Sequence, residues 1–326
     1  MPTVLLQGQL FPSEIKQLKQ EFLRYDFFDL NDLPIEELPA AARQSTEIYY
    51  GQQLPKDALE QLSALHWIHI PSPSLQGVPL DEIYRRGSLL LTNTLGSSVQ
   101  QVAEYAMGGL LYFAKNISLW QGMKRDNKEK IWKSPHRESI WTLENKIFLQ
   151  VGLARLGTEI TKKANDWGMR IWGVQEKKTF HPHCQKTFSK DELQHVLPLS
   201  DIVSVCLPRR RKYHHWFKEE QFNLMKSGSI LIVLGHGSAI DEAALVLAAE
   251  TGKFRGIVID AFEKAPLPSN SPLWNLPNTL ISPEVAFLPY DTQKRTSFRL
   301  FRHNMRQFVR GNYTDMKNVI SRLDET

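Results

Sequence analysis

The chain has 326 residues, enough for two average domains, and 42% of them are hydrophobic and 23% charged, as in ordinary globular proteins. Its 40 basic and 35 acidic residues give a formal charge of +5, which suits anionic small ligands but does not by itself indicate nucleic-acid binding. The two cysteines, Cys184 and Cys206, exclude a disulfide framework and fit the reducing cytoplasm. The longest apolar run, residues 230–234, is far shorter than the roughly 20 residues of a membrane span, and the N-terminal residues lack signal-peptide features. We therefore expect a soluble, cytoplasmic protein with no membrane or nucleic-acid partner.

Residues 1–97 alternate between strand and helix patterns. An amphipathic helix is predicted from Pro12, and a second between Pro55 and Leu65. The apolar face of the first helix comprises Ile15, Leu18, Phe22 and Leu23. Strands are predicted at residues 4–6, 47–51, 67–70 and 88–92. Strands that alternate with helices are typical of a parallel sheet with helices on both faces.

A long apolar helix is predicted at residues 99–117, followed by a polar loop at 124–137. A helix that is apolar on nearly all sides packs in a core or against another subunit. From residue 146 the alternation resumes, and this second series predicts another doubly wound sheet. Its helices are expected at 152–167 and 241–251, and its strands at 146–151, 170–174, 201–207, 229–234, 256–259 and 279–282.

The last helical pattern has an apolar stripe and a basic opposite face, with Gly311 where a C-terminal cap belongs. A single apolar stripe has to pack on something, most simply on the first unit. The expected fold class is therefore α/β, with two doubly wound parallel-sheet domains of the Rossmann or flavodoxin type, the first discontinuous. The stripe comprises Phe298, Phe301, Met305, Phe308 and Val309.

The segment IFLQVGLARLG at residues 147–157 is a candidate dinucleotide-binding turn. A strand there enters a glycine-rich turn that opens a helix, which is the context the dinucleotide fingerprint requires. The helix N-terminus offers N–H groups and a partial positive charge to a pyrophosphate. Ala154 replaces the second glycine, whose role is to let the backbone approach the pyrophosphate. A strand–turn–helix corner that binds nothing is the alternative. The candidate cofactor residues here are Gly152, Ala154, Arg155, Leu156 and Gly157.

Several motifs, in their order and spacing, resemble those of the D-isomer-specific 2-hydroxyacid dehydrogenases. Among them are TNTLG at 92–96, LENK at 143–146, MKSG at 225–228 and DAFE at 260–263. The resemblance covers nearly the whole chain. It implies an NAD(P)-dependent reaction on a small 2-oxo or 2-hydroxy acid and a homodimer built around the helix at 99–117. It also implies a substrate domain formed by residues 1–97 and 290–326, and a dinucleotide domain formed by residues 98–289.

The residues that carry the chemistry of that family differ in this chain. The family uses an arginine, a glutamate and a histidine, and the resemblance places them at His236, Ala265 and Glu284. In one interpretation, His236 and Glu284 form a rebuilt acid–base pair, because a carboxylate can orient an imidazole from either side. In the other, the site is inactive and the fold binds a dinucleotide or a protein partner. The three changes, together with Ala154, favour the second interpretation for the family's own reaction.

The strand at 170–174 is followed by Gln175, where an acidic residue would bind the ribose of NAD. Because this acid is missing and Lys177 lies close by, NADP is slightly favoured over NAD. Glu176 argues the other way, since a slip of one residue would restore an acid. The basic run at 209–212 is either a solvated loop or an anion site.

Four further residues complete the candidate cofactor site: Pro208, Arg209, Gly235 and Asp260. The resemblance implies that Asp260 contacts the nicotinamide amide, and capping of the following turn is the alternative. The loop HPHC at 181–184 holds metal-capable side chains, but no second cluster has ligand spacing, so a surface loop and no metal are expected. We assign no role to His214 and His215.

Overall fold

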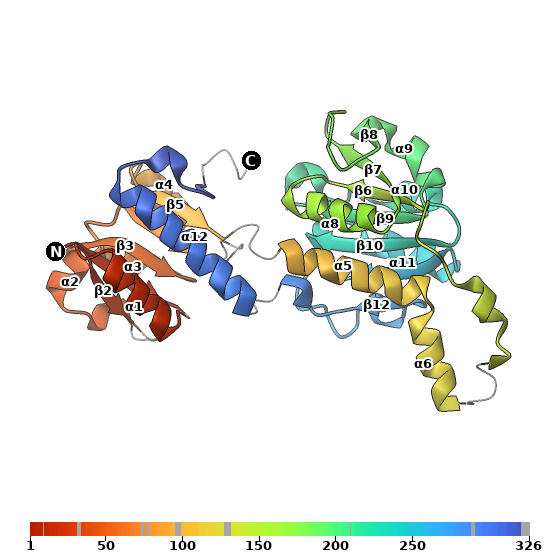
Figure 1. Ribbon diagram of the computed structural model, residues 1–326, viewed down its shortest axis with the longest axis horizontal. Helices are drawn as coiled ribbons and strands as arrows, with labels where there is room; N and C mark the ends of the chain where they lie inside the picture. The colour runs from red at the N-terminus through yellow and green to blue at the C-terminus, as the bar shows by residue number, and fades with distance from the viewer. Residues whose placement is uncertain are drawn as a thin grey trace. The chain divides into compact units, whose positions relative to one another are not determined.

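The structure, a computed structural model, describes residues 1–8, 10–30, 34–72, 75, 78–94, 99–126, 132–208, 210–287 and 291–320. The chain divides into two compact units, Met1–Ser98 with Pro289–Thr326 (unit 1) and Val99–Leu288 (unit 2). Each unit contains one sheet covered by helices (Figure 1), and every strand pair in both sheets is parallel. The predicted α/β fold class with two doubly wound sheets is therefore confirmed. Among the described residues, no helix is long and apolar enough to span a membrane.

The sheet of unit 1 has the strand order β2-β1-β3-β4-β5. Its strands are β1 (Thr3–Gln7), β2 (Asp26–Asp29), β3 (Thr46–Gly51), β4 (Trp67–Ile70) and β5 (Leu90–Asn93). Its helices are α1 (Pro12–Glu21), α2 (Ala40–Gln44), α3 (Lys56–Gln61), α4 (Leu80–Arg85) and α12 (Asp291–Val309). The sequence patterns do not predict β2, α2 and α4, which are too short for a periodic signal.

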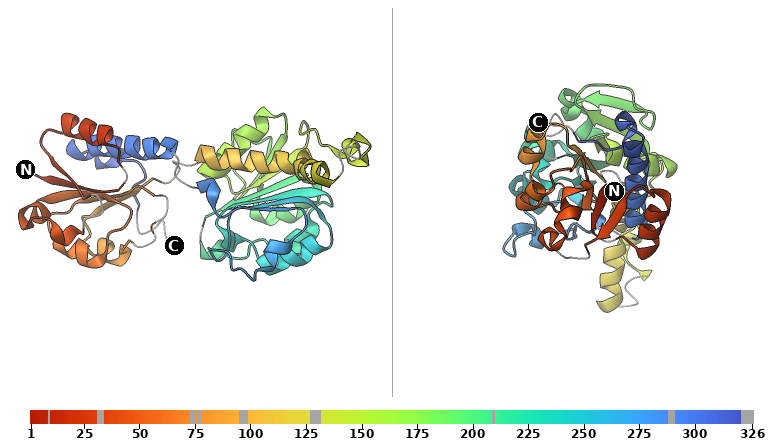
Figure 2. Two further views of the ribbon diagram at one scale, coloured as in Figure 1. Left: turned by 90° about the horizontal axis from the view of Figure 1, so that it is seen from below. Right: turned by 90° about the vertical axis from the view of Figure 1, so that its left-hand side faces the viewer.

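Helices α1 and α12 cover one face of this sheet, and α3 and α4 cover the other (Figure 2). The C-terminal helix packs on unit 1 through its predicted stripe, with Phe301 stacked on Trp67 at a centroid distance of 5.2 Å. Two residues of the predicted apolar faces are exposed, Leu23 at 77% and Val309 at 43%. Both lie at the C-terminal end of their helix pattern, beyond the packed surface.

The sheet of unit 2 has the order β12-β11-β10-β9-β6-β7-β8. Its strands are β6 (Ile147–Val151), β7 (Arg170–Gln175), β8 (Lys186–Ser189), β9 (Ile202–Leu207), β10 (Ser229–Gly235), β11 (Phe254–Ile259) and β12 (Thr279–Ile281). Its helices are α5 (Val99–Ala114), α6 (Ile117–Asp126), α8 (Arg155–Asp166), α9 (Leu193–Val196), α10 (Glu219–Leu224) and α11 (Glu242–Glu250). Helices α5 and α8 cover one face, and α9, α10 and α11 the other.

The helix predicted at 99–117 is in fact two helices. Helix α5 ends at Ala114, and Asn116 has a φ of 53°, a left-handed conformation that asparagine tolerates better than most residues. Helix α6 then runs to Asp126, so the predicted polar loop at 124–137 begins too early. Most apolar residues of α5 are buried against α8 and the sheet of unit 2. Packing within unit 2 therefore largely accounts for the apolar character of α5.

Candidate functional site

The glycine-rich turn joins β6 to α8. Gly152 has a φ of 89°, and a Cβ there would lie 2.3 Å from the carbonyl oxygen of Cys206. A Cβ on Gly157 would lie 1.9 Å from the carbonyl oxygen of Gly152. Both glycines are therefore required by the turn itself, whether or not a ligand binds. Ala154 is the N-cap of α8, and its side chain caps none of the N–H groups of the first turn.

The described candidate cofactor residues all lie at the carboxyl edge of the unit 2 sheet. The order in which successive strands are added to the sheet reverses between β6 and β9. In folds of this type, ligands bind in the crevice beyond the carboxyl ends of the strands at such a point. Arg209 lies outside the described residues. Five of the others end a strand or directly follow one: Gly152, Gln175, Pro208, Gly235 and Asp260.

The side chains after β7 are already engaged with one another. The Gln175 amide donates to the carbonyl oxygen and hydroxyl of Thr179, at 3.1 and 2.6 Å. The Glu176 carboxylate accepts hydrogen bonds from Lys212 at 3.0 Å and from the Tyr213 hydroxyl at 3.3 Å. The hydrogen bond from Lys212 holds the pKa of Glu176 below its ordinary value. Glu176, on the loop after β7, therefore neutralises part of the positive charge of the basic run after β9.

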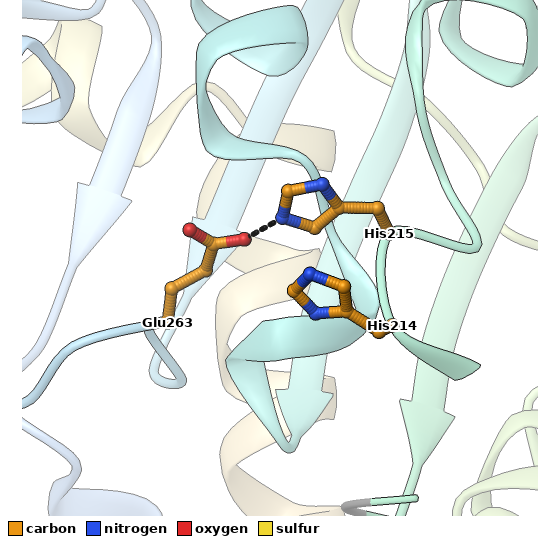
Figure 3. Close-up of side chains that lie close together, drawn as sticks. All are labelled: His214, His215 and Glu263. Atoms are coloured by element: carbon orange, nitrogen blue, oxygen red, sulfur yellow. Dashed lines mark hydrogen bonds and ion pairs between the residues drawn. The ribbon is translucent and has the colours of Figure 1, made fainter. Parts of the chain in front are cut away.

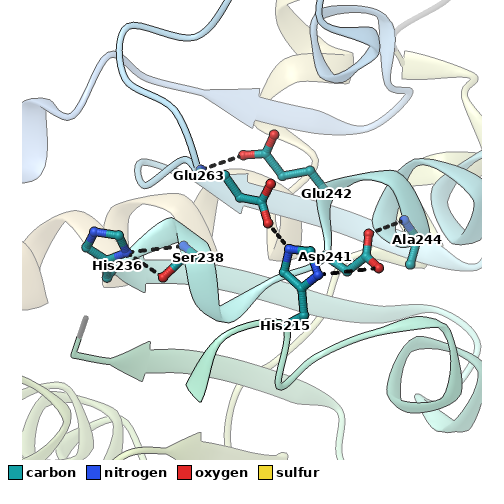
Figure 4. A network of polar contacts seen from close by, with 7 residues as sticks. All are labelled: His215, His236, Ser238, Asp241, Glu242, Ala244 and Glu263. Atoms are coloured by element: carbon teal, nitrogen blue, oxygen red, sulfur yellow. Dashed lines mark hydrogen bonds and ion pairs between the residues drawn. The ribbon is translucent and has the colours of Figure 1, made fainter. Parts of the chain in front are cut away.

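His236 lies on the loop after β10, between Gly235 and the short 3₁₀ turn Gly237–Ala239. Its Nδ1 accepts a hydrogen bond from the backbone N–H of Ser238 at 3.2 Å and lies 2.8 Å from the Ser238 hydroxyl (Figure 4). An Nδ1 that accepts a hydrogen bond carries no proton, so the neutral ring is protonated on Nε2. The loop thus fixes the tautomer of His236.

Asp260 follows β11 and organises the loop that carries Glu284. Its carboxylate accepts hydrogen bonds from the Ser282 hydroxyl at 2.5 Å and from the backbone N–H groups of Val285 and Ala286 at 2.9 Å. Burial raises the pKa of Asp260, and these hydrogen bonds oppose the rise. Burial and then the negative charge of Asp260 raise the pKa of Glu284, which has a φ of 55°. The charge of Asp260 therefore acts on Glu284, which stands where the resemblance places the family's histidine.

The candidate pair His236 and Glu284 is not joined in this structure. Among the described residues, Asp260 is the charged group that shifts the pKa of Glu284, and His236 makes no hydrogen bond or ion pair with it. Ala265 is exposed and has no group that could take part in proton transfer. The structure brings the three positions to neighbouring loops of one edge, after β10, β11 and β12.

Sequence reasoning missed a histidine at this edge. His215 has a φ of 46°, and its Nε2 is hydrogen-bonded to the carboxylate of Glu263 (Figure 4). Its Nδ1 lies 3.9 Å from the Asp241 carboxylate, and its backbone N–H donates to the carbonyl oxygen of Ser238 at 2.8 Å. His215, Asp241 and Glu263 follow three neighbouring strands. Their places just beyond predicted strand ends were the signal available in the sequence.

The loop at 181–184 packs on the start of α8. His181 Nε2 lies 3.0 Å from the Thr158 hydroxyl, and His181 Nδ1 lies 3.5 Å from Cys184 Sγ. Burial lowers the pKa of His181 and raises that of the Cys184 thiol to about 11. Within the described part of the chain, the side chains close enough together to bind a metal ion are those of His214, His215 and Glu263, outside this loop.

Comparisons with known proteins agree with this architecture. Residues 107–286 match the sequence model described as the NAD binding domain of D-isomer specific 2-hydroxyacid dehydrogenases. A glyoxylate reductase of Korarchaeum cryptofilum is 27% identical over 240 residues, which is 72% of this chain and 70% of that protein. A glyoxylate/hydroxypyruvate reductase B of Citrobacter koseri is 23% identical and covers 90% of both chains.

A solved structure from the same family, from Aeromonas salmonicida, superposes with a TM-score of 0.78 at 23% identity. The match covers 98% of this chain and 99% of that one. The likeness in fold extends over both units, and the family match covers more than half of the chain. The resemblance read from the sequence motifs is confirmed: the chain belongs to the D-isomer specific 2-hydroxyacid dehydrogenase family.

Proposed function

We propose that the chain binds a nicotinamide dinucleotide at the carboxyl edge of the unit 2 sheet and is a poor catalyst of the family's reaction on simple 2-oxo acids. The observation that carries the second part is that His236, Ala265 and Glu284 follow β10, β11 and β12, at the positions where the resemblance places the family's arginine, glutamate and histidine. Reduction of a 2-oxo acid needs a donor for the carbonyl oxygen and a cation for the carboxylate. Ala265 has no polar side-chain group, and Glu284 carries no positive charge in either protonation state.

The expected loss of rate follows from the missing groups. Removing a general acid typically lowers the rate by 10²–10⁴, and removing a donor to the developing oxyanion lowers it by a comparable factor. We therefore expect glyoxylate reduction, and oxidation of D-lactate and D-glycerate, to run at least about 10⁴-fold slower than in an intact relative.

The direct test measures turnover beside an intact relative. The chain and the Korarchaeum cryptofilum glyoxylate reductase are assayed with glyoxylate and hydroxypyruvate, with NADH and NADPH supplied in turn. Dinucleotide binding without turnover supports the proposal. Turnover of either acid within about tenfold of the relative contradicts it, and so does failure to bind both dinucleotides.

A second candidate is a reductase that uses His236 and Glu284 as a rebuilt pair. The fixed tautomer of His236 favours it, because the neutral ring then carries its proton on Nε2, from which it can pass to a carbonyl oxygen. Such activity requires a protonated His236 with an ionised Glu284, so it declines towards alkaline pH. It also disappears in both His236→Ala and Glu284→Gln. Turnover that survives both substitutions excludes the pair.

For the cofactor we propose NADP in preference to NAD, because the chain has Gln175 in place of an acid and Lys177 and Lys212 nearby. Glu176 opposes this preference by pairing with Lys212. Replacing Glu176 with Gln should tighten NADPH binding about fivefold, the value of one exposed charge contact, and leave NADH within about twofold. Glu192→Gln is the matched control, since Glu192 forms a similar exposed pair with Lys178 at 3.2 Å. Tighter binding of NADH than of NADPH by the wild type contradicts the preference.

We also propose a homodimer through the segment around α5 and α6. Helix α5 is largely buried within unit 2, but three large apolar side chains between residues 117 and 140 are exposed: Ile117 at 40%, Trp132 at 74% and Ile140 at 42%. Sedimentation equilibrium should show a dimer at micromolar concentration, and Trp132→Lys should weaken it. Leu247→Lys, at an apolar residue of α11 that is 62% exposed, should leave it unchanged. A wild-type monomer contradicts the proposal.

A further inference from the structure

Two histidines and a glutamate gather at the carboxyl edge of the unit 2 sheet. His214 and His215 follow β9 and Glu263 follows β11, and one donor atom of each lies within 4.8 Å of the others (Figure 3). The imidazole rings stack with their centroids 4.0 Å apart, and His215 Nε2 is hydrogen-bonded to Glu263. His214 and Glu263 are exposed and His215 is half-buried, so an ion can reach the cluster from solvent.

The surroundings of this cluster are rich in carboxylates. The Asp241 carboxylate lies 3.9 Å from His215 Nδ1, and Glu242 accepts a hydrogen bond from the backbone N–H of Glu263 at 2.8 Å. In the part of the chain that the structure describes, neither Asp241, Glu242 nor Glu263 forms an ion pair with a lysine or arginine. A bound cation would place a positive charge among these three carboxyl groups.

The backbone holds the central histidine in place. His215 adopts a positive φ, and its N–H donates to the carbonyl oxygen of Ser238. Asp241 is fixed as the N-cap of α11 by a hydrogen bond from the backbone N–H of Ala244 at 3.0 Å. Metal-bound histidines usually direct their second ring nitrogen at a carboxylate, which fixes the orientation of the ring. Asp241 lies on that side of His215.

We propose that His214, His215 and Glu263 bind a divalent transition-metal ion of the Zn²⁺ class. Two imidazole nitrogens and a carboxylate oxygen suit Zn²⁺, and three protein ligands leave a fourth position for water. Ligands about 2.0–2.1 Å from a tetrahedral ion stand about 3.4 Å apart, which side-chain rotation can reach from 4.8 Å. On binding, His215 becomes the Nδ1–H tautomer, with its proton facing Asp241 and its Nε2 lone pair on the ion.

The test is calorimetric titration of the chelator-treated and desalted full chain with ZnCl₂. We expect one ion per chain. His214→Ala, Glu263→Gln and His215→Asn should each weaken binding by about 100-fold or more, because a lost ligand matters more than a lost outer partner. Asparagine is used at position 215 because it tolerates the positive φ. Thermal midpoints of the metal-free variants show that each one folds.

Asp241→Asn sharpens the test, since asparagine keeps the helix cap but carries no charge. It should weaken Zn²⁺ binding about 10–100-fold. His195→Ala, at an exposed histidine of the same unit, should leave the affinity unchanged. The strong visible absorption of four-coordinate Co²⁺ gives a second readout, and it should vanish in Glu263→Gln.

Three results overturn the proposal: a wild-type chain that takes up no Zn²⁺, equal affinity in wild type and the His214→Ala/His215→Asn/Glu263→Gln variant, or loss of binding in His181→Ala. The last would assign the ion to the loop at 181–184. None of the three ligands belongs to the residues proposed for dinucleotide binding. Failure of one proposal therefore leaves the other untouched.

Discussion

Two parts of the carboxyl edge of the unit 2 sheet differ in how closely their residues match the family. The turn between β6 and α8 keeps Gly152 and Gly157, which the backbone requires for steric reasons. The loops after β10, β11 and β12 carry His236, Ala265 and Glu284 at the positions where the resemblance places the family's catalytic groups. On this resemblance, the glycines that the backbone needs are kept, whereas the residues that would carry the family's chemistry differ. The comparison teaches that the fold alone does not establish the reaction.

The largest expected effect is a gain of activity. If the loops keep the family's backbone, His236→Arg, Ala265→Glu and Glu284→His together should raise glyoxylate turnover by about 10³-fold, since a general acid and an oxyanion donor are each worth at least 10². Steady-state kinetics with NADPH and NADH measure it. The double variant that lacks Glu284→His should stay inactive. No gain in the triple variant would mean that the loops, and not only their side chains, have diverged.

The next effect is on stability. Gly157→Ala places a methyl group 1.9 Å from the carbonyl oxygen of Gly152, so α8 must shift, and we expect a loss of about 3 kcal/mol in the free energy of unfolding. Urea unfolding followed by circular dichroism measures it. Gly108→Ala is the matched control, because a Cβ there meets nothing within 4 Å. Equal stability of the two variants would show that the turn tolerates a side chain.

A smaller effect is expected on cofactor affinity. Ala154→Gly removes the methyl group that keeps the backbone from approaching a pyrophosphate, so NADPH and NADH should both bind about tenfold more tightly, or about 1.4 kcal/mol. Fluorescence titration measures both affinities. An unchanged affinity for both would place the pyrophosphate away from the N-terminus of α8.

The smallest effect concerns Glu284 and pH. A carboxyl group whose folded pKa is raised stabilises the fold at acid pH, and this contribution is lost as pH rises through that pKa. Glu284→Gln should therefore gain stability relative to the wild type between about pH 4 and about pH 7. Unfolding curves at both pH values measure the difference, with exposed Glu138→Gln as control. The prediction is contradicted if the wild type becomes more stable relative to the variant as the pH rises.

The fold was predictable because most of its strands are buried apolar runs that local patterns detect. Edge strand β2, with the sequence DFFD, and the one-turn helices escaped detection because they have too few apolar residues for a period. The break at Asn116 was missed because one left-handed residue leaves the helical period on both sides almost intact.

The candidate site was only partly predictable. The turn at 152–157 has a local signature, so the sequence alone places it. The contacts of His215 with Glu263 and Asp241 join residues up to 48 positions apart, and they depend on which strands are neighbours. The same is true of Asp260 and Glu284, whose proximity follows from the pairing of β11 with β12. Strand order therefore had to be known before these clusters could be recognised.

The central claim is that the turn still binds a dinucleotide while the loops no longer support the family's reaction. One measurement tests both halves: calorimetric titration of the chain with NADPH, followed by addition of glyoxylate to the saturated complex while the absorbance of reduced nicotinamide is recorded. We predict saturable binding of one NADPH per chain and a constant absorbance. Absence of binding, or loss of the absorbance at a rate within about tenfold of the Korarchaeum cryptofilum reductase, would contradict the account.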